Sequence, residues 1–189
     1  MARILTLTGV SGSGKTTLAR LLIERVDGTS IVTSYATRKA RASDVPGEYN
    51  YVSSRTYDAM ALRGEFLWTA THGSVRYGTK AIDIDIALGK PEGLSIMILV
   101  PSVMQALREY LTARGALQTH MPIYIIVPDE DVLMRRLARR GDARKEVEKR
   151  FSEARSWKEA ATASDVPYAF VCNDGPIEAA YEQVLRSLI

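Results

Sequence analysis

A glycine-rich segment near the amino terminus constrains this chain more than any other feature. Residues 9–17 read G-V-S-G-S-G-K-T-T and fit the pattern G-x-x-x-x-G-K-S/T at every fixed position. An apolar run, Ile4 to Thr8, comes directly before the segment, and a helical pattern with apolar residues on one face follows it. This setting favours a phosphate-binding loop over an ordinary Gly/Ser turn.

Each residue type in the loop suits a nucleotide phosphate. The glycines let the backbone turn its N–H groups inward, and the positive end of the following helix attracts anions. Lys15 supplies a point charge, and the Thr16 hydroxyl can bind Mg²⁺, which is the expected metal. The predicted phosphate-binding residues are Gly9, Ser11, Gly12, Ser13, Gly14, Lys15, Thr16 and Thr17.

Length and charge limit the classes of protein that fit. A chain of 189 residues that is 46% hydrophobic can bury one normal core, so no second domain is needed. The net charge of +3 suits phosphate-bearing small molecules and falls short of the dense basic clusters of a duplex-DNA binder. We therefore expect small anions rather than nucleic acid as partners.

Cysteine content and hydropathy indicate the compartment. The single cysteine, Cys172, excludes an intrachain disulfide and a Cys-rich zinc site. No apolar run approaches the roughly 20 residues of a membrane span, and the amino terminus runs into a strand pattern rather than a leader. We expect a soluble, cytoplasmic protein with no membrane partner.

Alternating strand and helix patterns predict an α/β fold. About five strands should form a parallel sheet with helices on both faces, and ligands should bind at the carboxyl ends of the strands, where the loop lies. Strand patterns occur at residues 4–8, 30–35, 94–100, 123–127 and 168–172, and helical patterns at 18–26, 80–88, 102–113, 131–139, 144–160 and 177–188.

The segment at residues 36–48 is polar and contains a turn-forming Pro-Gly pair, so we expect it to be a loop that faces solvent or a ligand. Arg38 and Arg41 lie three residues apart in it, and Ser34 and Tyr49 supply hydroxyls on either side. Guanidinium groups bind phosphate oxygens in a fixed fork. A solvated basic loop would have the same composition, but beside a phosphate loop an acceptor phosphate site is the more economical interpretation.

The strand and helix patterns from residue 36 to residue 79 predict a small α/β insertion over the sheet. Its expected elements are a short strand at 49–52, a helix at 54–63, and strands at 66–71 and 74–77 joined by a turn.

A series of arginines follows the fourth predicted strand of the core. Arginines that close over a moving phosphoryl group stabilise its charge. A solvated helix face is the alternative interpretation, which we favour for Arg135 and Arg139. For Arg136, Arg140 and Arg150 the functional interpretation is favoured only by the family resemblance given next.

Taken together, these residues resemble the guanylate kinase family of nucleoside monophosphate kinases. Several segments match in order over essentially the whole chain. They are the phosphate loop, T-S-Y-A-T-R-K-A-R-A-S-D-V-P-G-E-Y-N-Y-V-S, G-E-F-L-W with H-G-S-V-R-Y-G-T, the lid pattern L-M-R-R-L-A-R-R-G, and the terminal V-C-N-D.

The resemblance implies a P-loop kinase fold, ATP as phosphoryl donor, and a core at residues 1–33, 80–135 and 149–189 with an acceptor-binding insertion at 34–79 and a lid at 136–148. The residues to which it assigns roles fall into three groups. They are Lys15 and Thr16 at the ATP phosphates and Mg²⁺, with Asn173 on the adenine side; Arg38, Arg41, Tyr49 and Tyr77 at the acceptor phosphate; and Arg136, Arg140 and Arg150 in the lid. Lys15, Arg38 and the lid arginines are the expected catalytic residues.

Two positions depart from the family pattern at the acceptor base. Where the family reads F-L-E-W, this chain has Phe66-Leu67-Trp68, so a carboxylate is missing. Where strand three of the family ends in L-D-I-D or L-E-I-D, this chain has I-L-V-P-S. Ser34 and Thr79 still offer hydroxyls, and Trp68 is either a core aromatic or a surface on which the base stacks.

Three functions are compatible with these observations. The first is an ATP-dependent kinase acting on GMP, dGMP or a modified nucleotide. The second is a ribose 1,5-bisphosphate phosphokinase making phosphoribosyl diphosphate, a relative that also lacks the carboxylates and ends in a similar N-D-G pattern. The third is a non-catalytic binding module, against which the intact phosphate loop argues. A homodimer is compatible with all three.

Overall fold

The computed structural model describes residues 2–127, 130–138 and 156–188. None of the helices in this part of the chain combines the length and the apolar character that a membrane span requires. The predicted helix at 144–160 falls mostly outside the described residues, which contain a helix at 156–163.

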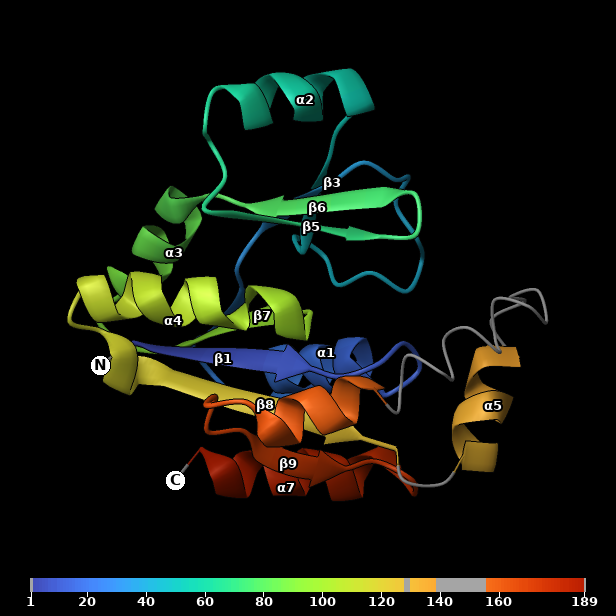
Figure 1. The fold of residues 1–189 in the computed structure, drawn as a ribbon. Coiled ribbons are helices and arrows are strands. Elements are labelled where there is room, and N and C mark those ends of the chain that lie inside the picture. Colours follow the sequence, from blue (N-terminus) through green and yellow to red (C-terminus); the bar gives the residue numbers. More distant parts are fainter. Residues whose placement is uncertain (1, 128–129, 139–155, 189) are drawn as a thin grey trace.

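The core is a five-stranded parallel sheet, as the sequence predicts. Its strands lie in the order β2-β7-β1-β8-β9, and every neighbouring pair is parallel. The strands are β1 (Arg3–Thr8), β2 (Thr29–Ile31), β7 (Leu94–Leu99), β8 (His120–Ile126) and β9 (Ala169–Cys172). Because β1 is central, the phosphate loop that follows it emerges at the middle of the sheet edge (Figure 1).

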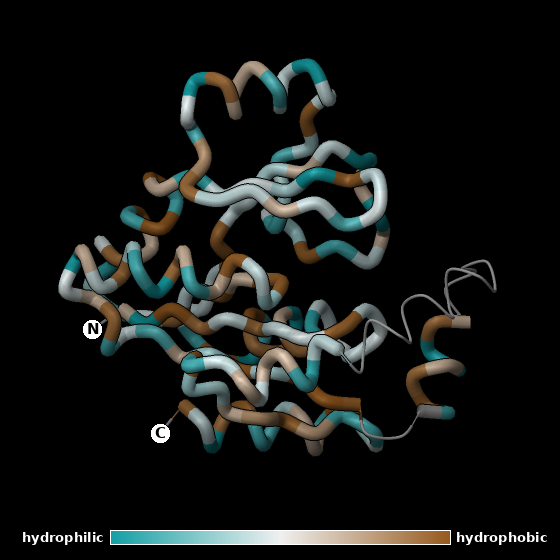
Figure 2. Tube along the Cα trace, viewed as in Figure 1, coloured by the Kyte–Doolittle hydropathy of each residue, from teal (hydrophilic) through white to brown (hydrophobic). Residues whose placement is uncertain are grey.

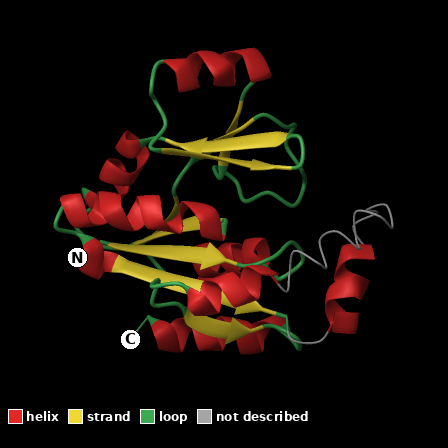
Figure 3. Ribbon diagram, viewed as in Figure 1, coloured by secondary structure: helices red, strands yellow, loops and turns green. Residues whose placement is uncertain are grey.

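Helices cover both faces of this sheet, so its strands are buried on two sides (Figure 3). One face packs against α1 (Lys15–Arg25) and α7 (Ile177–Ser187). The other packs against α3 (Ala81–Leu88), α4 (Met104–Ala113) and the helix at 156–163. Two short 3₁₀ helices precede elements of the core: η1 (Pro101–Val103) comes before α4, and η2 (Leu117–Thr119) comes before β8. Helix α5 (Glu130–Ala138) lies beyond the carboxyl ends of the strands (Figure 1).

Side-chain alternation along β1 divides the interior into two cores. Ile4 joins the cluster beneath α3 and α4, whereas Leu5 and Leu7 join the cluster beneath α1 and α7. Successive residues of a strand point to opposite faces of the sheet, so one strand serves both cores. Hydrophobic and hydrophilic residues alternate along the helices (Figure 2), as in amphipathic helices that pack against a core.

A second, four-stranded sheet stands over the core beneath α2 (Ser54–Leu62) (Figure 1). Its order is β4-β3-β6-β5, in which β3 pairs with β4 in parallel and with β6 antiparallel. The Ser53 side chain caps α2 by accepting a hydrogen bond from the backbone N–H of Thr56. The strands are β3 (Ser34–Ala36), β4 (Tyr49–Tyr51), β5 (Trp68–His72) and β6 (Val75–Thr79).

The predicted single strand at 30–35 is wrong, because the chain changes sheets inside it. Its first part is β2, which pairs with β7, and its last residues begin β3 in the other sheet. The Val32 N–H still donates to the Ile96 carbonyl, whereas the Ser34 N–H donates to the Glu48 carbonyl. A run of β-prone residues gives no local sign of such a switch, since both halves satisfy the same pattern.

His120 is a half-buried histidine at the start of β8, next to β1. Its Nε2 atom is hydrogen-bonded to Thr6 Oγ1 at 3.0 Å, and its Nδ1 atom has no hydrogen-bond partner among the described residues. Burial, helped by the charge of Arg108, lowers the pKa of His120 to about 4. The imidazole is therefore neutral in the folded protein at neutral pH.

We expect this histidine to make the protein less stable in mild acid. Between its unfolded pKa of 6.5 and its folded pKa of about 4, the unfolded chain takes up a proton that the folded chain does not. The free energy of unfolding should therefore fall with falling pH, with a contribution from His120 of up to about 1.4 kcal/mol per pH unit in this window. Urea unfolding measured from pH 7 to pH 4.5 should show that the free energy of unfolding falls less steeply in His120→Gln than in the unsubstituted protein. Parallel plots of this free energy against pH would contradict the lowered pKa of His120.

Candidate active site

A cavity lies between the two sheets, at the carboxyl ends of the core strands. The phosphate loop, the end of β7 and one face of the second sheet all contribute to its walls. The predicted donor-side residues Gly9, Ser11, Lys15 and Thr16 line it together with the predicted acceptor-side residues Ser34, Arg38, Arg41, Tyr49, Trp68, Tyr77 and Thr79. The fold thus brings both predicted sets into one cavity, whereas Gly12, Ser13, Gly14 and Thr17 are not part of its lining.

Two glycines fix the path of the phosphate loop. Gly9 has φ of +143°, and a Cβ atom there would lie 2.6 Å from the Ile125 carbonyl oxygen. Gly14, with φ of +98°, lies against the Asn173 amide nitrogen in the same way. A positive φ disfavours any residue with a side chain, and these close approaches leave no room for one.

Lys15 begins α1 and folds back over the loop. Its Nζ atom donates to the carbonyls of Gly9 and Val10, each at 2.7 Å. The ammonium group is therefore held against the cavity wall, next to Thr16. A phosphate bound in the loop would meet this charge directly.

Asn173 lies beneath the loop and is only 2% exposed. Its Nδ2 atom donates to the Ser13 backbone carbonyl at 2.7 Å, and the Asn173 backbone carbonyl accepts a hydrogen bond from the Arg136 guanidinium at 2.7 Å. Asn173 thus connects the phosphate loop with α5. Its contacts are with the Ser13 backbone and the Arg136 side chain, and the position beside an adenine ring, which only the resemblance implies, stays a prediction.

Arg38 is the centre of a charged and aromatic cluster on the second sheet. Its guanidinium donates two hydrogen bonds to the Asp44 carboxylate, at 2.7 and 2.8 Å, and its Nε atom donates to the Tyr77 hydroxyl at 3.4 Å. It also lies over the rings of Tyr49 and Tyr51, 4.9 and 5.6 Å from their centroids. The arginine is therefore held in one orientation from several sides.

Asp44 is the anchor of this cluster, and the sequence analysis did not single it out. Besides Arg38, its carboxylate accepts hydrogen bonds from the Arg41 backbone N–H at 2.8 Å and the Tyr51 hydroxyl at 2.7 Å. Burial alone would raise the pKa of Asp44, but these hydrogen bonds outweigh burial and lower it to about 2. A carboxylate three residues after Arg41 was the available signal in the sequence.

Glu48 is a second carboxylate at the cavity wall, and it is 5% exposed. Burial raises the pKa of Glu48, and the carboxylate accepts a hydrogen bond from the Val45 backbone N–H at 3.0 Å. Burial and the hydrogen bond with Glu48 also raise the pKa of the Tyr49 hydroxyl. Glu48 therefore contacts residues that lie next to Arg38 and Asp44.

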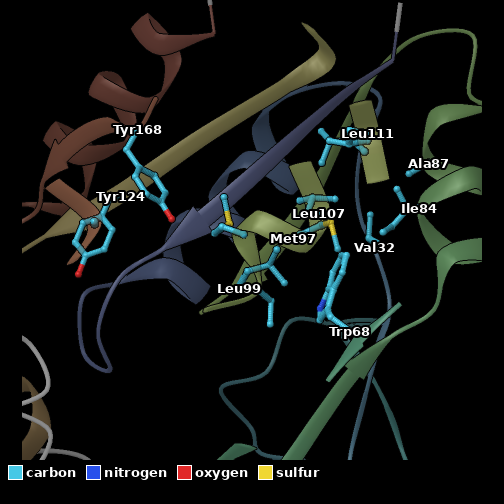
Figure 4. Packing of buried hydrophobic residues seen from close by; sticks show 14 residues of the cluster. Val32, Trp68, Ile84, Ala87, Met97, Leu99, Leu107, Leu111, Tyr124 and Tyr168 are labelled. Atoms are coloured by element: carbon cyan, nitrogen blue, oxygen red, sulfur yellow. The ribbon is translucent and has the colours of Figure 1, made fainter. Parts of the chain in front are cut away.

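Ser34 and Thr79 form a hydroxyl pair at the other end of the cavity wall. Their oxygens are 2.8 Å apart, and Trp68 lies directly opposite Thr79 in the β5–β6 pairing. Trp68 is 8% exposed and packs with Val32, Met97 and other core side chains (Figure 4). The indole is therefore a core aromatic that also forms part of the cavity wall.

The sequence model of the family described as Guanylate kinase matches residues 1–189 of this chain. The chain belongs to the guanylate kinase family. A guanylate kinase of Oleidesulfovibrio alaskensis is 32% identical over 96% of this chain and 84% of its own length. A guanylate kinase of Helicobacter pylori is 30% identical over 90% of this chain and 80% of its own length, and one of Nitrobacter winogradskyi is 34% identical over 94% and 78%.

The fold agrees with this family. A crystal structure of guanylate kinase from Anaplasma phagocytophilum superposes with a TM-score of 0.70 and covers 99% of this chain and 84% of its own chain. At 20% sequence identity, this likeness supports the P-loop kinase fold alone.

The lid arginines of the family pattern are only partly described. Arg136 lies on α5 and is half-buried through its contact with Asn173, whereas Arg135 on the same helix is exposed. Arg139, Arg140 and Arg150, together with most of the expected lid at 136–148, lie outside the described residues.

Replacing Asp44 should weaken binding of a nucleoside monophosphate. Asp44→Asn keeps the shape but removes the charge that holds Arg38, and hydrogen bonds to charged groups contribute about 1.5–3 kcal/mol. We expect the Kd for GMP, measured by calorimetry, to rise about tenfold or more.

Asp58→Asn is the matched control for this experiment. Asp58 pairs with Arg76 on the second sheet, and neither residue lines the cavity. Its GMP affinity should match that of the unsubstituted protein. Equal Kd values for all three proteins would show that Asp44 does not orient Arg38 for binding.

Proposed function

We propose that this protein transfers the γ-phosphoryl group of ATP to the phosphate of a nucleoside monophosphate, with GMP as an acceptor. The observation that carries the proposal is that a complete phosphate loop and the Arg38 cluster line one cavity. A kinase needs a donor phosphate site and an acceptor phosphate site facing each other. Membership of the guanylate kinase family supports both the reaction and the acceptor.

On the donor side, Lys15 and the loop N–H groups hold the phosphates of ATP. Among the described residues, no group of three metal-binding side chains occurs, so a Mg²⁺ ion would be held by the Thr16 hydroxyl, phosphate oxygens and water. The ion neutralises phosphate charge when it is bound. Asn173 keeps the loop in place through Ser13.

On the acceptor side, Arg38, Arg41, Tyr49 and Tyr77 hold the phosphate of the monophosphate. An acceptor phosphate is already ionised at neutral pH, so no general base is required and catalysis is positioning plus charge stabilisation. Asp44 keeps the Arg38 fork pointed in one direction.

The family pattern assigns the core to residues 1–33, 80–135 and 149–189, acceptor binding to residues 34–79 and the lid to residues 136–148. It gives Arg136, Arg140 and Arg150 the role of stabilising the charge of the transferring group. Of these three arginines, Arg136 is described, whereas Arg140 and Arg150 lie outside the described residues.

The two other functions have less support. The relatives found carry the name guanylate kinase, which does not favour a sugar bisphosphate acceptor. A non-catalytic module has no need for Lys15 and Thr16 in an intact loop. The proposed setting is the cytoplasm, with ATP and a nucleoside monophosphate as the small-molecule partners.

Lys15→Ala should abolish turnover while leaving the fold intact. Removing a charge that stabilises the transferring phosphoryl group typically lowers kcat by about 100-fold or more. A coupled assay of ADP release from ATP, Mg²⁺ and GMP measures the loss, and thermal melting verifies the fold.

Lys90→Ala is the control for this substitution. Lys90 lies near the amino end of β7 and contacts Ser30, away from the cavity. Its kcat should stay close to that of the unsubstituted protein. Retained turnover in Lys15→Ala would refute the proposed mechanism.

A further inference from the structure

We propose that the acceptor site does not read the exocyclic groups of a purine, so that GMP, IMP and AMP are phosphorylated with comparable efficiency. This inference rests on the proposed function and specifies its substrate class. It follows from the spacing of the cavity wall, the chemistry of its polar groups and the positions of its carboxylates.

The spacing comes from strand β6. Tyr77 belongs to the Arg38 cluster, and Thr79 belongs to the hydroxyl pair two residues further along. An antiparallel strand rises about 3.4 Å per residue, so the two positions are about 7 Å apart on the same face. A nucleotide whose phosphate binds at Tyr77, with its ribose in between, places its base beside the hydroxyl pair.

The wall around the hydroxyl pair is apolar. Trp68 lies opposite Thr79 on β5, and Ala70 lies opposite Tyr77. Leu99 and Val103 line the cavity from the end of β7 and from η1. These side chains can pack against a flat ring, but they cannot distinguish a carbonyl from an amino group.

The polar groups beside the base are two hydroxyls. A hydroxyl can donate one hydrogen bond and accept others, and its hydrogen rotates to suit the partner. The Ser34–Thr79 contact uses one of the two hydrogens, which leaves one donor and several acceptor sites for a ligand. Such a pair can accept from the amino group of adenine or donate to the carbonyl of guanine.

An ionised carboxylate accepts hydrogen bonds and cannot donate them, so it would distinguish an amino group from a carbonyl. The carboxylates of the described cavity wall lie away from the hydroxyl pair. They are Asp44 and Glu48, and both belong to the phosphate end. Asp44 already accepts from Arg38 and Tyr51, and Glu48 already accepts from the Val45 N–H. Within the described ranges, therefore, no carboxylate of the cavity wall lies beside the hydroxyl pair, where it would accept from the 2-amino group that distinguishes guanine from hypoxanthine.

The decisive experiment compares kcat/KM for GMP, IMP and AMP with saturating ATP and Mg²⁺. A site that hydrogen-bonds a particular group of its substrate typically has a kcat/KM about 10⁴-fold or more lower for the analogue that lacks the group. For this protein we expect the kcat/KM values for GMP, IMP and AMP to agree within about tenfold. A preference for GMP over IMP of about 100-fold or more, with rapid GMP turnover, would overturn this inference and leave the proposed function standing. No turnover on any of the three would remove both.

Substitutions at Trp68 test the cause of the relaxed selectivity. Trp68→Glu places an acceptor-only group opposite Thr79 and should raise the GMP-to-IMP ratio of kcat/KM at least tenfold. Trp68→Phe keeps the wall apolar and should leave the ratio unchanged. Because Trp68 is part of the core, melting curves verify that each variant is folded, and an unchanged ratio in folded Trp68→Glu counts against the inference. If Trp68→Glu does not fold, the comparison of nucleotides on the unsubstituted protein still decides.

Discussion

The parallel direction of the five core strands is the constraint on which the rest of the structure depends. In a parallel sheet all carboxyl ends meet at one edge, so the segments that follow the strands gather there. The phosphate loop follows β1, η1 follows β7, and Asn173 directly follows β9. Residues more than 150 positions apart, such as Ser13 and Asn173, thereby become hydrogen-bonded neighbours.

A buried guanidinium needs partners, and this requirement organises the second sheet. Burial would lower the pKa of Arg38, but hydrogen bonds with Asp44 and Tyr77 outweigh that cost and raise it. The carboxylate, the phenol rings and the arginine form a preorganised unit that has already lost its side-chain freedom. An anion that binds there does not need to order a flexible side chain.

Much of this arrangement could be predicted from the sequence, because it is encoded locally. The phosphate loop follows from its spacing, and the parallel sheet of about five strands follows from the alternation of strand and helix patterns along the chain. Predicting that Lys15, Arg38, Tyr49 and Tyr77 share one cavity required the family resemblance, because no local sequence pattern relates residue 15 to residue 77. The switch of sheets between β2 and β3 and the anchoring role of Asp44 depend on tertiary contacts, which single-sequence patterns do not contain.

Trp68 belongs to two environments at once, because one part of its indole completes the core and another forms the cavity wall. A substitution that alters which acceptor fits therefore also alters how well the protein packs. Selectivity and folding stability cannot vary independently at this position. Any lineage that acquires a new acceptor through residue 68 must first hold enough stability in reserve to tolerate the change.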